Sequence, residues 1–379
     1  MEVDVVKNLH LTLVPLSIVL LVAGCGGGGS SSNTPNTSIP VGTVQITASN
    51  ATTAAKGAAT PSQTMVKQGT TGATASKAAT QSGASSKSVM DIALAQLKRV
   101  ERIKLPALAA SVVGASISPF PVTFGCGSYA NTNSYANTLN STSGTMAMDI
   151  QGTTNANTGA INITSATLTY VNCVEPNPAA VSATTTTNGS MTLTIGSKSG
   201  GVINATTGYL EGTVGSPLRE SVSMSFTNFS VLDTAPTTPE TLTTNGGFTL
   251  GIVDTGTQMT VTMSGSSFVM VSSIDGTSSM KNFSIVNTVT AATGAYNYTI
   301  SMTVASTASN LVGDIVITTP VAFQGIGSGN PTVGKMVVYG SSNSSLTLEV
   351  VGAGVAVTVN DGTTATQPVY SATLTWAQL

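Results

Sequence analysis

The feature that most constrains the fold of this chain is an alternation of apolar and hydroxyl side chains with a period of two. From Pro121 to the last residues, stretches recur with Val, Leu, Ile, Met or Phe at every second position and mainly Thr, Ser or Asn between them. Such alternation is typical of β-strands with one buried and one solvated face. The clearest examples are 191–195, 222–226, 259–263, 296–304 and 346–350.

Turn signals containing glycine divide these strands. They are Asn188-Gly189, Asn245-Gly246-Gly247, Asp275-Gly276, Thr293-Gly294 and Asp361-Gly362. Because such residues tolerate positive φ, they favour hairpins and hence antiparallel neighbours. We predict about 14 to 16 strands in a mainly β fold, an extended antiparallel sheet that forms a sandwich or a curved open barrel. A membrane β-barrel also alternates, but aromatic residues are only 4% of the chain and form no girdles.

The segment before the sheet, 44–120, is rich in Ala and Thr. Within it, 44–46 alternates like a short strand, and Asn50 can cap a weak helix towards Ala59. A stronger amphipathic helix is predicted over 89–105, where Ser88 and Asp91 have capping-box spacing. Its polar face carries the one basic cluster of the mature chain. This cluster either belongs to a solvated helix face or contacts anionic head groups of the membrane. That cluster comprises Lys98, Arg99, Arg102 and Lys104.

The N-terminal residues 1–24 have the pattern of a secretory signal peptide. The apolar run 9–22 is shorter than the roughly 20 residues that span a bilayer. It ends in Leu21-Val22-Ala23-Gly24-Cys25, which resembles the lipobox of bacterial prolipoproteins. The resemblance implies that Cys25 becomes the first mature residue and carries diacylglyceryl and N-acyl (palmitate) lipid. A plain signal peptide with a chance cysteine is the alternative.

A flexible tether is predicted over 25–43, because Gly and Ser dominate its first residues. The residue after Cys25 is Gly26 and not the Asp that retains such lipoproteins at the inner membrane, so we expect a lipid-anchored protein of the outer membrane. The antiparallel β domain is predicted over 121–379. The two remaining cysteines, Cys126 and Cys173, predict one structural disulfide in an oxidising envelope.

Composition excludes several classes of function. The only histidine, His10, lies in the predicted signal peptide, so the mature chain has no histidine for a catalytic triad, a general base or a zinc site. After cleavage the net charge is about −1, which provides no field for nucleic acid. We therefore expect no catalysis, no metal and no cofactor other than the covalent lipid on Cys25.

The candidate chemical motifs are weak. The segment 114–118 lacks the second glycine of a hydrolase elbow. A calcium site needs several acidic ligands, whereas Asp254, Asp275 and Asp361 are isolated acids close to glycines. These three residues are therefore predicted to form turns. Glu211, Glu220 and Arg219 lie close in sequence and predict a surface salt bridge. None of these motifs indicates an active site.

The C-terminal stretch 331–379 resembles a family of uncharacterised proteobacterial lipoproteins. The residues that carry the resemblance are Gly334-Lys335-Met336-Val337-Val338-Tyr339-Gly340, 346–350 and Thr375-Trp376, together with 46–51 and the cysteine pair. Members often have an Asp-rich turn before the final strand, of which only Asp361-Gly362 remains here. The resemblance supports the anchor and the β fold and implies no activity.

Two functions remain open besides a disfavoured enzyme. The first is a structural or adhesive envelope protein whose Thr-rich faces present a hydrogen-bonding surface to a polymer, a matrix or another cell. The second is a carrier that holds an apolar ligand on a curved sheet. The carrier would use methionines that otherwise belong to the core, namely Met224, Met259, Met263 and Met302.

Overall fold

A computed structural model gives the fold of one compact unit, Pro40–Leu379. Within it the structure describes residues 42–66, 97, 100, 116–125, 143–154, 161–176, 184–203, 210–234, 239–274, 276–306, 312–327, 329–363 and 368–379.

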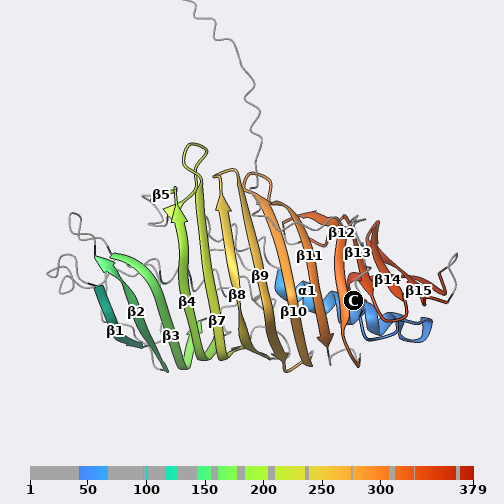
Figure 1. Cartoon of the computed structure of the whole chain (residues 1–379), viewed down its shortest axis with the longest axis horizontal. Helices are drawn as coiled ribbons and strands as arrows, with labels where there is room; N and C mark the ends of the chain where they lie inside the picture. Colours follow the sequence, from blue (N-terminus) through green and yellow to red (C-terminus); the bar gives the residue numbers. More distant parts are fainter. Residues whose placement is uncertain are drawn as a thin grey trace, which may run out of the picture. The chain divides into compact units, whose positions relative to one another are not determined.

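One large antiparallel sheet dominates this unit (Figure 1). Within the described residues its 14 strands follow the chain in order, except that a small two-stranded sheet, β5–β6, is inserted between β4 and β7. The strands are β1 (Ser116–Gly125), β2 (Thr145–Thr154), β3 (Ile161–Pro176), β4 (Thr184–Ser199), β5 (Val202–Ile203), β6 (Leu210–Glu211), β7 (Leu218–Asp233), β8 (Glu240–Asp254), β9 (Gln258–Ser272), β10 (Gly276–Thr290), β11 (Ala295–Ser306), β12 (Ile315–Ile326), β13 (Val333–Tyr339), β14 (Ser345–Val351), β15 (Gly354–Asn360) and β16 (Tyr370–Thr375).

The sheet is open, with β1 at one edge and β16 at the other. This confirms the predicted mainly β class, and it takes the form of one continuous sheet. All five stretches with the clearest alternation lie inside strands, namely β4, β7, β9, β11 and β14. The sheet begins at Ser116, slightly before the predicted start at Pro121.

The apolar positions of the strands form the core on one face of the sheet. Its centre is a chain of aromatic contacts in which Phe226 touches Phe229, Phe248 and Phe268, with ring centroids 5.3 to 5.7 Å apart. Edge-on and tilted contacts at these distances add to the stabilisation from burial. The opposite face carries Thr, Ser and other half-buried or exposed residues, as the alternation predicted.

Helix α1 (Ala51–Val66) covers part of the apolar face, where it contacts β10, β11, β14 and β15 (Figure 1). It buries small side chains at helical spacing, Ala51, Ala54, Ala55 and Ala58, which allow close approach to the sheet. The predicted alanine-rich helix is therefore present. It continues beyond Ala59, through Pro61, to Val66.

The segment before α1 is not the predicted short strand. Val44 and Ile46 are buried and Gln45 is exposed, so the alternation is real. However, the segment makes individual hydrogen bonds instead of a ladder: Ser341 N–H donates to Val44 O at 2.7 Å, and Ile46 N–H donates to Ser344 Oγ at 2.9 Å. A short 3-10 turn, η1 (Ala48–Asn50), then leads into α1.

Two predicted hairpin turns are wrong: Asn188-Gly189 lies in the middle of β4, and Asn245-Gly246-Gly247 in the middle of β8. Each of these two segments lies opposite a β-bulge in the neighbouring strand. Asn172 on β3 and Asn228 on β7 have φ of 46° and 47°, and their N–H groups donate to the Oδ1 atoms of Asn188 and Asn245. Asparagine tolerates this left-handed backbone, which bends the strand.

The other turn signals lie at strand ends, as predicted. Gly276 begins β10, Gly294 precedes β11, and Gly362 follows β15, all with positive φ. Asp275 lies outside the described residues.

Of the predicted helix 89–105, the structure describes Leu97 and Val100. Both are helical and buried in the core, which agrees with the predicted apolar face. Its basic residues lie outside the described residues.

Candidate functional site: a hydroxyl row across the solvent face

A row of hydroxyl side chains crosses the solvent face of the large sheet, on 11 of the 12 described strands from β3 to β16. Residues opposite one another in the strand register define it, and Val337 on β13 is its single interruption. We call it the hydroxyl row. It comprises Ser165, Thr194, Ser223, Thr249, Ser264, Ser284, Ser301, Thr318, Thr347, Thr358 and Ser371.

The row exists because every strand in it except β13 places Ser or Thr at the same register position. Its members are exposed or half-buried, and both sequence neighbours of Ser223, Val222 and Met224, are buried. Neighbouring strands lie about 4.8 Å apart, so the hydroxyl groups repeat at that interval. This spacing is comparable with the length of one sugar residue in an extended glycan.

Cross-strand hydrogen bonds orient some of these hydroxyls and their neighbours. Ser223 Oγ lies 3.3 Å from Thr249 Oγ1 within the row. Beside the row, Thr167 Oγ1 lies 3.0 Å from Thr192 Oγ1, and the same distance separates the hydroxyls of Thr260 and Thr288. A hydroxyl has one donor and two acceptor positions, so each pair keeps hydrogen-bonding capacity for a ligand.

The hydroxyl row contains no charged side chain. An ion pair two residues from the row joins Lys335 Nζ on β13 to Glu349 Oε2 on β14 at 3.1 Å, and both side chains are well exposed. This pair neutralises itself locally. The row can therefore exchange hydrogen bonds with an uncharged polar polymer, and it provides no charge for an anionic or a cationic one.

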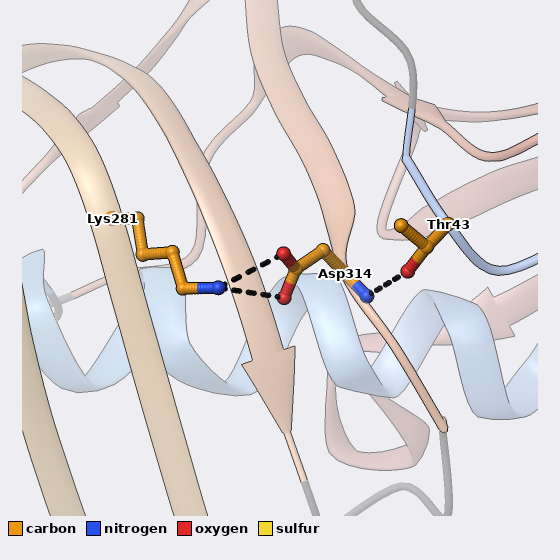
Figure 2. Close-up of polar contacts among 3 residues, drawn as sticks. All are labelled: Thr43, Lys281 and Asp314. Atoms are coloured by element: carbon orange, nitrogen blue, oxygen red, sulfur yellow. Dashed lines mark hydrogen bonds and ion pairs between the residues drawn. The ribbon is translucent and has the colours of Figure 1, made fainter.

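The end of the predicted tether is attached to the sheet through Asp314, which immediately precedes β12 (Figure 2). Thr43 Oγ1 accepts the Asp314 N–H at 2.6 Å, and Thr43 N–H donates to Asp314 O at 2.8 Å. The Asp314 carboxylate also binds Lys281 Nζ on β10, at 3.0 Å from Oδ2 and 3.4 Å from Oδ1. Asp314 thus joins the incoming segment to two positions in the sheet.

The predicted lipidation and signal residues lie outside the described residues. These are Leu21, Val22, Ala23, Gly24 and Cys25. Cys173 is described: it is buried in β3 and disulfide-bonded. Cys126 lies outside the described residues, so its pairing with Cys173 stays a prediction.

The acidic turn residues act as turn formers. Asp254 accepts the N–H groups of Gly212 and Gly256 at 2.9 and 2.8 Å. Asp361 accepts Thr363 N–H at 2.9 Å and the Thr363 hydroxyl at 2.6 Å. Among the described residues, no three His, Cys, Asp or Glu side chains gather as metal ligands. Of the elbow-like segment 114–118, Ser116 is the first residue of β1.

The predicted surface salt bridge around Glu220 is wrong. Glu220 points to the buried face, where its side chain is fully covered, whereas Arg219 points to the solvent face. The partner of Glu220 is Lys198 on β4, with Nζ 3.3 Å from Oε1. Sequence proximity favoured Arg219, but successive residues of a strand point to opposite faces, and the partner comes from the neighbouring strand.

The methionines proposed to line a carrier site are core residues. Met224, Met263 and Met302 are buried, and Met259 packs against the same core. An apolar cavity does lie between α1 and the last strands, but its volume is about 20 Å³, which is enough for about one water molecule. This cavity is therefore too small for an apolar ligand. The lining of the cavity is Ala59, Ser62, Tyr298, Phe323, Met336, Leu348, Val355, Trp376 and Leu379.

Comparison with protein-family models, with curated proteins and with solved structures finds no match for this chain. The resemblance to proteobacterial lipoproteins therefore stays a prediction from the sequence. Among the described residues, no helix combines the length and apolar character that crossing a membrane requires.

Proposed function

We propose that this chain is a lipid-anchored envelope protein with an adhesive role, which binds an uncharged, extended polysaccharide through the hydroxyl row. The observation that carries the proposal is the register of the row, which places a hydroxyl on 11 of the 12 strands between β3 and β16. Repeated weak hydrogen bonds along a polymer add up through multivalency, although each one contributes only about 1 kcal/mol.

The anchor part of the proposal rests on the sequence 21–25 and on the tether that follows. In this arrangement Cys25 holds the chain at the outer membrane, and the sheet is presented beyond the tether. Changing Cys25 to Ser removes the thiol that accepts lipid. We expect this variant to lose incorporation of labelled palmitate and to leave the membrane fraction, whereas a Ser30→Ala variant keeps both. Labelled lipid on the Cys25→Ser variant would contradict the anchor.

The adhesive part is tested by removing hydroxyls at the centre of the row. The triple variant Thr249→Val, Ser264→Ala and Ser284→Ala removes three neighbouring hydroxyl groups without adding bulk. The matched control changes Thr241 and Thr243 to Val on β8, beyond the position that lies opposite the β7 bulge at Asn228. The full chain in detergent is applied to arrays of neutral β-linked glucans and N-acetylglucosamine oligomers.

We expect the parent chain and the control to bind an extended neutral glycan and the triple variant to lose that binding. Near-ultraviolet circular dichroism checks that the triple variant is folded. Equal binding by the triple variant, or binding to charged glycans alone, would refute the hydroxyl row as the site.

A further inference from the structure

The last strand of the sheet, β16, leaves a free edge. In the described part of the chain only β15 pairs with it. Thr375 N–H donates to Gln378 Oε1 at 2.8 Å and so points away from β15. By contrast, a Cβ added to Gly354 on β15 would lie 3.0 Å from Leu374 O, which therefore points toward β15. Because polar groups of successive residues point to opposite edges, the N–H and C=O groups of Ser371 and Thr373 face the free edge.

Among the described residues, this edge has none of the usual protection against pairing with another strand. Edge strands are commonly protected by charge, proline or a bulge. The residues of β16 are Tyr-Ser-Ala-Thr-Leu-Thr, without charge or proline, and its register with β15 has no bulge. The other edge strand, β1, contains Pro119 and Pro121, which lack N–H donors.

This difference between the two edges indicates which strand of a second copy would pair with β16. Pairing of β16 with β1 of another copy would be head-to-tail and would meet the prolines. Pairing of β16 with a second β16 uses the same edge twice and closes as a two-fold dimer. Because β16 carries no charge, its apposition to itself brings no like charges together.

The apolar side of β16 is also incompletely covered. Tyr370, Ala372 and Leu374 are half-buried, although they occupy the same face as Val355 and Val357 of β15, which are buried to within 1%. An additional strand beside β16 would bury these three side chains further.

We propose that two copies of this chain pair through β16, antiparallel, about a two-fold axis at Ala372. In this register Ser371 of each copy forms a hydrogen-bonded pair with Thr373 of the other copy. Ala372 meets the partner's Ala372 in a non-hydrogen-bonded pair, where side chains approach most closely and a small residue fits. Leu374 packs against the partner's Tyr370, a favourable cross-strand combination.

The dimer does not depend on the proposed glycan binding, because it rests on the backbone and the apolar face of β16. It would nevertheless extend the solvent face, because Ser371 lies opposite the partner's Thr373, as Thr167 lies opposite Thr192 within the chain. An edge of six residues belongs to the small, transient class of interfaces below about 1,200 Å². Covalent trapping is therefore the appropriate measurement.

Single cysteines test the register. In a non-hydrogen-bonded antiparallel pair the Cα atoms are about 4.5 Å apart, which lies within the range of a disulfide. Under mild oxidation, the full-length Ala372→Cys chain in detergent should form a covalent dimer. Ser371→Cys and Thr373→Cys should not do so separately, but a mixture of the two should yield the mixed dimer. The unchanged chain gives the background from the native cysteines.

A second pair of variants tests the backbone. Thr373→Pro removes the N–H that faces the free edge, whereas Thr373→Val removes the hydroxyl and keeps the N–H. Sedimentation at high concentration should show the dimer for the parent chain and for Thr373→Val, and monomer for Thr373→Pro. A parent chain that is monomeric throughout, Ala372→Cys cross-linking no better than Ser371→Cys, or a dimer that survives Thr373→Pro would each overturn the proposal.

Discussion

Thr43 and Asp314 bind each other through two hydrogen bonds, although 271 positions separate them in the sequence. The Thr43 hydroxyl accepts the Asp314 N–H, and the Thr43 N–H donates to the Asp314 carbonyl. The second is a backbone bond that any residue at position 43 could make. The first needs a hydroxyl on the side chain.

Thr43→Val should therefore loosen the attachment of the N-terminal segment, whereas Thr43→Ser should preserve it. We expect the valine variant to lose about 1 kcal/mol, because the Asp314 N–H keeps no protein acceptor. Hydrogen exchange read by mass spectrometry should become faster in peptides that contain Val44 and Ser341. Equal exchange in the two variants would show that the hydroxyl does not hold the segment.

The bulge at Asn228 predicts a stability difference between three residues at one position. Alanine at φ 47° is strained by about 1 to 2 kcal/mol, whereas glycine adopts this backbone freely. In urea unfolding we expect Asn228→Ala to be less stable than Asn228→Gly. Asn245→Ala, which removes the acceptor of the Asn228 N–H, should cost about 1 kcal/mol. An alanine variant as stable as the glycine variant would contradict the bulge.

The ion pair between Lys198 and Glu220 predicts a strongly asymmetric response to mutation. Lys198→Met removes the cation and leaves a fully covered carboxylate. Loss of one partner of a buried pair costs about 3 to 5 kcal/mol, and the partial exposure of Lys198 places the expected loss near the lower limit. Adding Glu220→Leu to Lys198→Met should recover most of it. Equilibrium unfolding of the two single variants and the double variant measures the coupling.

The burial of Tyr296 leads us to expect that the fold becomes less stable at alkaline pH. Burial raises the pKa of Tyr296 from 10.0 to about 12. Burial, with a smaller contribution from Tyr296, also raises the pKa of Tyr298. Between pH 10 and 12 the unfolded chain loses the Tyr296 proton while the folded chain keeps it, so stability must fall as the pH rises.

The Tyr296→Phe variant should show a smaller fall in Tm between pH 9 and 11 than the parent chain. At pH 7 it should be less stable by about 1 kcal/mol, because the Tyr296 hydroxyl donates to Gly329 O at 2.7 Å. Tyr370→Phe serves as a control for removing a tyrosine hydroxyl from another position. Parallel pH profiles for Tyr296→Phe and the parent chain would contradict this explanation.

The disulfide of Cys173 predicts a large effect of reduction. If Cys126 is its partner, the bridge closes a long loop and contributes roughly 3 to 4 kcal/mol. Reduction, or Cys126→Ala with Cys173→Ala, should lower the midpoint of unfolding. Peptide mapping without reduction should recover the two cysteines in one linked peptide pair, and recovery of Cys173 linked to Cys25 would disprove the predicted pairing.

The sequence predicted the strands well because alternation is a local property that burial on one face enforces. It failed at Asn188-Gly189 for an equally physical reason. Asn-Gly accepts positive φ in a hairpin turn and also opposite a bulge, and only the pairing partner decides between them. A repeated signal was present, because Asn-Cys at 172–173 and Asn-Phe at 228–229 and 282–283 recur at near-constant intervals.

The candidate site was predictable only in part. Thr-rich faces follow from the alternation, but a row requires the register between strands, which depends on turns and bulges outside any local window. The error at Glu220 has the same origin, because its partner Lys198 lies on a neighbouring strand. The extension of α1 beyond Ala59 likewise depends on contacts with the sheet, which override the weak propensity of a segment containing Pro61.

The order of the strands makes the large sheet divisible into hairpins. From β8 onward each strand of the large sheet pairs, among the described residues, only with strands adjacent to it in the chain. Stability and folding can then propagate from neighbour to neighbour, as in repeat proteins. Gene duplication or loss of one hairpin leaves the flanking strands antiparallel, with the same face towards the core, so a lineage could lengthen or shorten the solvent face two strands at a time.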